Sequence, residues 1–149
     1  MADEILNSSE APIIEFSGVS KTYLSGTHAL NDVNIKINSG EFVFIVGSSG
    51  AGKSTFMKLI MREEKANTGT IKVNGFDLTK MKRKQIPLLR RTMGIVFQDF
   101  RLIPTMNVFD NVAFAMHVVG ASTRDIRREV SKALSKVGLG DKARSMPMQ

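Results

Sequence analysis

The chain contains no cysteine, which excludes disulfide bridges and thiolate metal sites. It also lacks an apolar run long enough to cross a membrane, since the longest weakly polar stretch, residues 112–120, is short and contains His117. The opening residues, Met-Ala-Asp-Glu, have neither the basic start nor the apolar middle of a secretory signal. We therefore expect a soluble globular protein without covalent cross-links.

Length and composition are sufficient for a hydrophobic core. The chain has 149 residues, of which 42% are hydrophobic, and this is the size of one globular domain. The formal net charge of +7 is unevenly distributed: residues 1–70 hold 6 basic and 8 acidic side chains, whereas residues 71–149 hold 15 and 6.

The densest group of positive charges, called the basic cluster below, consists of Lys80, Lys82, Arg83, Lys84, Arg90 and Arg91. Such a cluster serves nucleic acid, the anionic inner surface of a membrane, or solvation alone. Because no aromatic residues are interleaved with it, we expect a solvated face and no nucleic acid, while an anionic membrane surface stays open as a partner.

What the sequence does contain is a phosphate-binding loop. Residues 47–55 read Gly-Ser-Ser-Gly-Ala-Gly-Lys-Ser-Thr, a full match to the pattern G-x-x-x-x-G-K-[ST]. The continuous apolar run at residues 42–46 predicts a strand covered on both faces. After the loop, Phe56, Leu59 and Ile60 recur at helical spacing. A strand, this loop and a helix together predict a site for a nucleoside triphosphate.

Each position of the loop has a chemical reason. Main-chain N–H groups must come close to the phosphate oxygens, which small or absent side chains allow. The residues expected in this role are Gly47, Ser48, Ser49, Gly50, Ala51 and Gly52. Lys53 is expected to reach the β and γ phosphates, the Ser54 hydroxyl to ligate Mg²⁺, and Thr55 to add a further phosphate contact.

The rest of the chain predicts an α/β protein with short strands. Residues 1–12 are interpreted as a polar leader. Strands are expected at residues 13–17, 33–37, 70–73, 76–78 and 93–97. The first two are predicted to form an antiparallel pair, and the middle two flank Asn74-Gly75, a strong hairpin signal.

Two helices are predicted in the last third of the chain. The first covers residues 108–119. The second begins with Ser122 or Thr123 as its N-cap and ends at Gly138. Its apolar face is predicted to consist of Ile126, Val130, Ala133, Leu134 and Val137.

Three motifs together resemble the ATP-binding-cassette (ABC) ATPase family. They are the phosphate loop, residues 19–23 (Val-Ser-Lys-Thr-Tyr) and residues 96–99 (Val-Phe-Gln-Asp), in the order and spacing of that family. The resemblance implies a P-loop NTPase fold, with an N-terminal antiparallel β subdomain and part of a RecA-like core. It also implies that Tyr23 stacks on the adenine of ATP and that Gln98 contacts Mg²⁺ and the attacking water.

The residues alone leave other roles open for Tyr23, which could simply pack or lie on the surface, and for Gln98, which could be an ordinary polar residue at a strand end. Within the family, residues 40–47, 87–91 and 96–102 are similar to the FtsE subfamily. That similarity implies a peripheral ATP-binding subunit at the cytoplasmic face of the plasma membrane. Its implied partners are an FtsX-like integral membrane protein and, in the complete protein, a second copy of itself, and its implied role is the control of cell division and cell-wall hydrolysis.

Residues 13–149 are expected to be a partial ABC domain. The family's signature Leu-Ser-Gly-Gly-Gln, its Walker B strand ending in Asp-Glu and its switch histidine do not occur in the sequence. Only Lys53 and Gln98 would then contribute to catalysis, so we expect this chain to bind ATP without hydrolysing it alone.

Other function classes stay open at this point. The chain could be the ATP-binding component of a different ABC importer or exporter, or a non-catalytic nucleotide-binding module. It could also be another P-loop protein, such as a small-molecule kinase or a GTPase, although the guanine-reading pattern Asn-Lys-x-Asp of a GTPase is missing.

Overall fold

The computed structural model describes residues 11–148, and these belong to two compact units divided between residues 93 and 94. Most of the predicted leader, residues 1–10, lies outside the described residues. Each unit has a hydrophobic core of its own. The strands predicted at residues 42–46 and 93–97 do not form, and all the strands of the described residues belong to the first unit.

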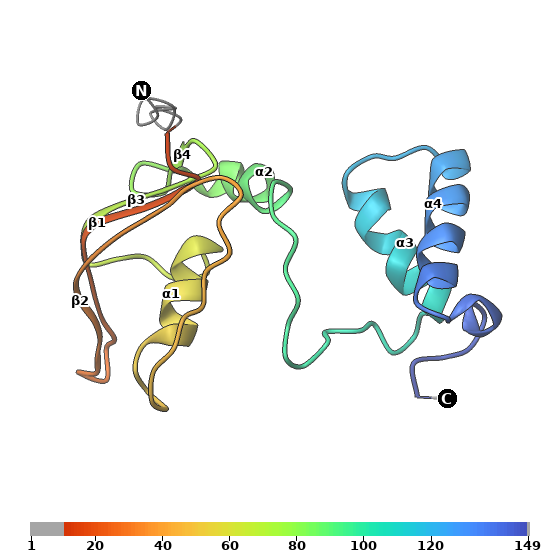
Figure 1. The fold of residues 1–149 in the computed structure, drawn as a ribbon, viewed down its shortest axis with the longest axis horizontal. Coiled ribbons are helices and arrows are strands. Elements are labelled where there is room, and N and C mark those ends of the chain that lie inside the picture. The colour runs from red at the N-terminus through yellow and green to blue at the C-terminus, as the bar shows by residue number, and fades with distance from the viewer. Residues whose placement is uncertain (1–10, 149) are drawn as a thin grey trace, which may run out of the picture. The chain divides into compact units, whose positions relative to one another are not determined.

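The first unit is built on an antiparallel sheet with the strand order β2-β1-β3-β4 (Figure 1). The strands are β1 (Ile14–Thr22), β2 (His28–Ile37), β3 (Thr68–Val73) and β4 (Phe76–Asp77). β1 pairs with β2 on one side and with β3 on the other, and Ile14 lies opposite both Ile37 and Val73. The predicted antiparallel pair is confirmed, with longer strands than expected.

The predicted hairpin between β3 and β4 is confirmed as well. Asn74 and Gly75 have φ angles of 48° and 79°, the left-handed conformation that a two-residue hairpin turn of type I′ requires. The Asn74 side-chain amide also donates to the Thr92 hydroxyl at 2.8 Å, which ties the turn to the chain that follows α2 (Ile86–Arg90).

Ion pairs connect β1 to both of its neighbouring strands, β2 and β3. The Glu15 carboxylate of β1 lies 3.4 Å from the Lys36 ammonium of β2 and 3.2 Å from the Lys72 ammonium of β3. Hydrogen bonding to Lys72, and then to Lys36, holds the pKa of the Glu15 carboxyl below its ordinary value of 4.5. The pairs are solvent-accessible and therefore add little stability. They join residues that the strand register places directly opposite each other.

Helix α1 (Lys53–Ile60) packs on the sheet and contributes to the core of the first unit (Figure 1). The predicted helix is confirmed, since Phe56, Leu59 and Ile60 are all buried. The ring of Phe56 stacks on that of Phe16 from β1, with 4.5 Å between the ring centroids. The buried core of this unit consists of Phe16, Val19, Phe56, Leu59, Ile60, Ile71, Val73, Leu78, Met81 and Leu89.

The basic cluster lies around η1 (Arg83–Gln85) and α2, and all of its side chains are exposed. Met81 and Leu89 from the same stretch are buried and hold it on the core. The Arg90 guanidinium donates to the Met61 carbonyl at 3.0 Å, whereas Lys82, Arg83 and Lys84 extend from the exposed side of this segment.

The second unit consists of α3 (Val108–Val118), α4 (Thr123–Lys136) and η2 (Gly140–Lys142). Both predicted helices are confirmed. The Asn107 side chain accepts from the Asp110 N–H and caps α3, and the Ser122 hydroxyl accepts from the Asp125 N–H and caps α4. The core of this unit consists of Ala113, Ile126, Val130 and Leu134.

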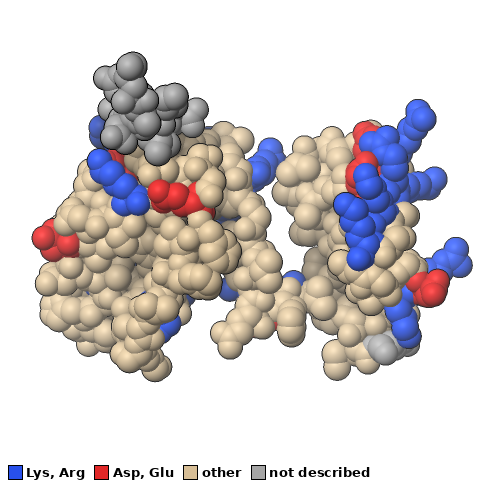
Figure 2. Space-filling model, viewed as in Figure 1, with Lys and Arg blue, Asp and Glu red and all other residues tan. Residues whose placement is uncertain are grey.

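Lys and Arg side chains occupy much of the outward face of α4 (Figure 2). The predicted apolar face was partly wrong, because Ala133 and Val137 are exposed. No helix within residues 11–148 is both long enough and apolar enough to span a membrane.

Residues 42–46 contradict the prediction of a buried strand. They form no strand, and Phe42, Phe44 and Val46 are 85%, 77% and 87% exposed. An apolar run becomes a buried strand only where other strands complete its hydrogen-bond ladder, and no described strand pairs with it. The same reason applies to residues 93–97, which are also irregular.

The close approach of β3 to β1 predicts that a side chain at position 69 destabilises the first unit. Gly69 has a φ of 81°, and a Cβ there would lie 2.3 Å from the Gly18 carbonyl oxygen. Gly69→Ala should lower the free energy of unfolding by about 2 kcal/mol or more, measured by urea denaturation. Gly75→Ala is the matched control, because φ is 79° there but a Cβ would meet nothing within 4 Å. It should lose only about 1 kcal/mol, and equal losses would contradict the packing argument.

Candidate functional site

The phosphate loop turns sharply into α1. The Ala51 N–H donates to the Ser48 carbonyl at 3.2 Å, and the Gly52 carbonyl accepts the first helical hydrogen bond from Phe56 at 2.8 Å. Gly52 has a left-handed φ of 89°, no side chain caps the helix, and its first turn contains no acidic residue. The unsatisfied N–H groups at this helix start are therefore available to an anion.

Lys53 lies folded over the loop that precedes it. Its ammonium donates to the carbonyl oxygens of Gly47 and Ser48, both at 2.7 Å. These are hydrogen bonds to neutral acceptors, and a phosphate oxygen is a stronger acceptor for an ammonium because it carries charge. The cation is thus already inside the loop where the phosphates of a ligand are expected.

Gly52 also sets the distance between the loop and the sheet. A Cβ on this residue would lie 2.3 Å from the Ala29 carbonyl oxygen and 2.9 Å from Leu30 Cδ2, both in β2. Only a glycine allows the start of α1 to lie against the second strand in this way. The loop motif predicts a glycine here because the backbone must approach a phosphate. The structure adds a second reason, the close packing of Gly52 against β2.

Tyr23 lies at the same site. Its hydroxyl is 3.1 Å from the Thr55 hydroxyl in the first turn of α1, and Thr55 is only 7% exposed. One cavity is lined by Tyr23, Thr27, Ala29, Ser49, Gly50, Gly52, Lys53, Ser54 and Thr55. The structure therefore brings together Tyr23 and most of the loop residues that the sequence singled out. Gly47 and Ser48 do not line this cavity, but their carbonyls accept the hydrogen bonds of the Lys53 ammonium. Ala51 lies in the same turn as Ser48.

Gln98 belongs to the second unit. It is exposed in a turn that the Phe100 N–H closes by donating to the Phe97 carbonyl at 3.3 Å, and the Arg101 guanidinium lies 3.8 Å from the centroid of the Phe97 ring. Its role towards Mg²⁺ and water stays a prediction.

Sequence reasoning missed the lining residues Thr27 and Ala29. The segment after Tyr23 folds back, because the Tyr23 N–H donates to the Thr27 carbonyl at 3.0 Å and the Gly26 N–H donates to the Tyr23 carbonyl at 2.9 Å. Gly26 was a signal for this turn. Nothing in the local sequence indicated that Ala29 of β2 would reach the phosphate loop, because that contact depends on the packing of α1 on the sheet.

This chain belongs to the ABC transporter family, whose sequence pattern matches residues 30–149. Among curated proteins it is similar to the cell division ATP-binding protein FtsE of Streptococcus pneumoniae, with 50% identity over 91% of this chain and 59% of the relative. The FtsE proteins of Bacillus subtilis and Escherichia coli are 50% and 48% identical over 92% of this chain and 60% and 62% of their own lengths. The chain thus spans about three fifths of these relatives.

Solved structures give the same fold. The dimeric bacterial ABC transporter cassette MJ0796 superposes with a TM-score of 0.82 at 31% identity, covering 91% of this chain and 62% of that one. A post-hydrolysis dimer of the same cassette bound to ADP and Pi gives 0.81 at 30% identity with the same coverage. The fold is therefore that of an ABC nucleotide-binding domain, of which this chain covers a part, as predicted.

The packing of Gly52 against β2 predicts how the site responds to a single methyl group. Gly52→Ala should weaken Mg-ATP binding about tenfold to a hundredfold, because the loop must move away from Ala29. Gly40→Ala is the control: φ is 81° there, a Cβ would meet nothing within 4 Å, and the residue lies outside the phosphate loop. Calorimetric titration of the two variants measures the difference, and the same loss in both would show that the contact with β2 is unimportant.

Proposed function

We propose that this protein is the ATP-binding part of an FtsE-like ABC complex that controls cell division and cell-wall hydrolysis. The observation that carries the proposal is the single cavity in which Tyr23 faces the phosphate loop at the start of α1. The similarity to FtsE proteins supports the biological role, and the ADP-bound cassette supports an adenine nucleotide as the ligand.

In this proposal the adenine stacks on Tyr23 and the phosphates bind over the N-terminus of α1. The backbone N–H groups of the loop cradle the β phosphate. Lys53 leaves the carbonyls of Gly47 and Ser48 and pairs with the β and γ phosphates, and Thr55 adds a hydroxyl. The full set of proposed ATP-binding residues is Tyr23, Gly47, Ser48, Ser49, Gly50, Ala51, Gly52, Lys53, Ser54 and Thr55.

The residues present fit a magnesium ion that is shared with the ligand. Ser54 is exposed and lines the same cavity, so its hydroxyl is available. Mg²⁺ retains several waters and takes most of its other ligands from phosphate oxygens, so one protein hydroxyl is a sufficient anchor. Bound there, Mg²⁺ would neutralise charge on the phosphates. Gln98 is proposed as a second contact to the ion and to the attacking water.

The complete protein is proposed to hydrolyse ATP as a homodimer at the cytoplasmic face of the plasma membrane, paired with an FtsX-like integral membrane protein. The dimeric cassettes among the similar structures support the homodimer. The alternatives are a component of another ABC importer or exporter and a non-catalytic module. The identity of 48–50% to FtsE proteins, against 30–31% to the other cassettes, favours the FtsE-like role.

Removal of the loop lysine tests the proposed ATP site. Lys53→Ala deletes a charge-assisted contact to the phosphates and should cost about 1.5–3 kcal/mol, or roughly a tenfold to hundredfold loss in Mg-ATP affinity. Lys58→Ala is the matched control, because it removes the same charge from an exposed side chain in the last turn of the same helix. Calorimetry on both variants decides the matter, and wild-type affinity in Lys53→Ala would refute the site.

The basic cluster tests the proposed membrane location. Reversing the charges of Lys82, Arg83 and Lys84 should weaken binding to vesicles that contain phosphatidylglycerol several-fold, while Mg-ATP affinity stays the same, and added salt should mimic the effect. The matched control reverses Arg124, Arg127 and Lys132 on the exposed face of α4. Co-sedimentation that responds to neither the cluster variant nor salt would contradict this location.

A further inference from the structure

Lys21 is an unusual lysine because it is buried. In the described part of the chain the buried polar or charged residues are Lys21, at 9% exposure, and Thr55, at 7%. Both contact the same aromatic residue: the Thr55 hydroxyl is hydrogen-bonded to the Tyr23 hydroxyl, and the Lys21 ammonium lies over the Tyr23 ring. Both buried polar residues of the described chain therefore contact Tyr23, one at its hydroxyl and one at its ring.

The position of the Lys21 ammonium is fixed by two partners. It lies 2.8 Å from the Glu64 carboxylate and 5.0 Å from the centroid of the Tyr23 ring. Burial of an ammonium is costly unless a counter-charge and hydrogen bonds compensate for the lost water. Glu64 supplies that compensation, and the face of an aromatic ring adds a favourable cation–π interaction.

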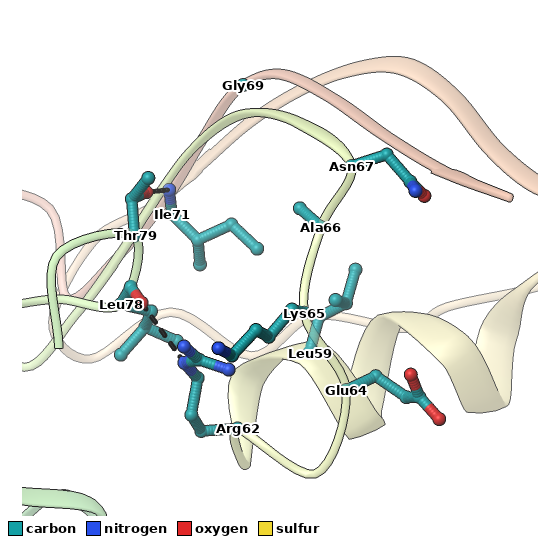
Figure 3. A pocket seen from close by; sticks show the side chains of 10 residues that line it. All are labelled: Leu59, Arg62, Glu64, Lys65, Ala66, Asn67, Gly69, Ile71, Leu78 and Thr79. Carbon is teal, nitrogen blue, oxygen red and sulfur yellow. Dashed lines mark hydrogen bonds between the residues drawn. The ribbon is translucent and has the colours of Figure 1, made fainter. Parts of the chain in front are cut away.

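Glu64 belongs to the segment that follows α1, and this segment is attached to the end of β1. The Asn67 side-chain oxygen accepts from the Thr22 N–H at 2.6 Å, and the Asn67 N–H donates to the Ser20 carbonyl at 2.9 Å. Glu64 and Asn67 also line a neighbouring cavity, together with Arg62 and Lys65 (Figure 3). Their side chains are bonded to Lys21 and Thr22 of β1, respectively.

The ring of Tyr23 is consequently held at two places. Its hydroxyl is tied to the first turn of α1 through Thr55, and one of its faces is covered by an ammonium that is itself anchored to the segment after α1 through Glu64. A planar ring has two faces and Tyr23 lines the cavity at the phosphate loop, so a stacked base would take the face that the ammonium does not cover. A cation on the covered face also restricts how the ring can tilt.

We propose that Lys21 is a positioning residue that holds the Tyr23 ring as a one-sided platform for the base of the bound nucleotide, with Glu64 holding Lys21. This inference rests on the proposed ATP site. Lys21 does not act on the phosphates: it is not among the residues that line the cavity, and its charge is neutralised by Glu64. Its effect is therefore confined to ligands that carry a base.

The chain offers a direct probe of this ring, because Tyr23 is its single tyrosine and it has no tryptophan. Tyrosine emission therefore reports on Tyr23 alone. Mg-ATP is expected to quench this emission by stacking, whereas Mg-tripolyphosphate, which has the phosphates and no base, is expected to leave it unchanged. The pair of ligands separates an effect on the platform from an effect on the phosphate loop.

The experiment titrates both ligands into the wild type, Lys21→Met, Lys21→Arg and Lys72→Met. Lys21→Met keeps an unbranched apolar side chain and should lose about threefold to tenfold in Mg-ATP affinity, with a smaller quench and unchanged tripolyphosphate affinity. Lys21→Arg should restore the wild-type ratio, since a guanidinium pairs with a carboxylate and stacks on a ring. Lys72→Met, which breaks the exposed pair with Glu15, should change neither affinity.

An equal loss for both ligands, or no loss for either, in Lys21→Met would overturn the inference. If Lys21→Met does not fold, Glu64→Gln decides: it removes the counter-charge with almost no change of shape, and an unchanged ratio of the two affinities would equally overturn it.

Tyr23→Ala separates this inference from the proposed function. If it lowers Mg-ATP affinity while Lys21→Met does not, only the role of Lys21 fails. If Tyr23→Ala leaves Mg-ATP affinity unchanged, or the wild type binds no Mg-ATP, the platform itself fails and the role of Lys21 fails with it.

Discussion

The contact between α1 and the antiparallel sheet is the constraint on which the first unit depends. Phe56 stacks on Phe16 at the centre of the core, and full burial of one such side chain contributes about 1.5–3 kcal/mol. The same contact fixes where α1 begins, because Gly52 then meets the carbonyl of Ala29. The proposed nucleotide site follows from this geometry: Thr55, in the first turn, can reach Tyr23 only because the helix lies on the strands.

Local signals in the sequence were sufficient for the elements whose stability is local. Asn74-Gly75 predicted the hairpin because its turn needs two left-handed residues, and Ser122 predicted the start of α4 because its hydroxyl caps the helix. The phosphate loop was recognised for a related reason, since its conformation and its expected ligand both require particular residue types at fixed positions. In each case neighbouring residues contain the whole physical cause.

The failures have the opposite cause. Residues 42–46 were predicted as a buried strand from their apolar content, yet a strand depends on partners elsewhere, and the described residues supply none. The Lys21–Glu64 pair was not foreseen either, because 43 positions separate its members and only the packing of α1 brings them within 2.8 Å. Tyr23 was placed near the loop through family resemblance, since no periodicity or spacing connects it to Thr55.

The folded-back position of Lys53 has a consequence for which ligands the loop can select. Its ammonium already has two neutral acceptors, the carbonyls of Gly47 and Ser48, so a ligand gains only the difference between its own oxygens and these. A single phosphate group gives the lysine little more binding energy than the two carbonyl hydrogen bonds that it would lose. A chain of phosphates supplies several charged oxygens at once, so the gain exceeds the loss of these two hydrogen bonds. In the proposed site the loop would therefore select ligands by the charge of their phosphates, independently of their base.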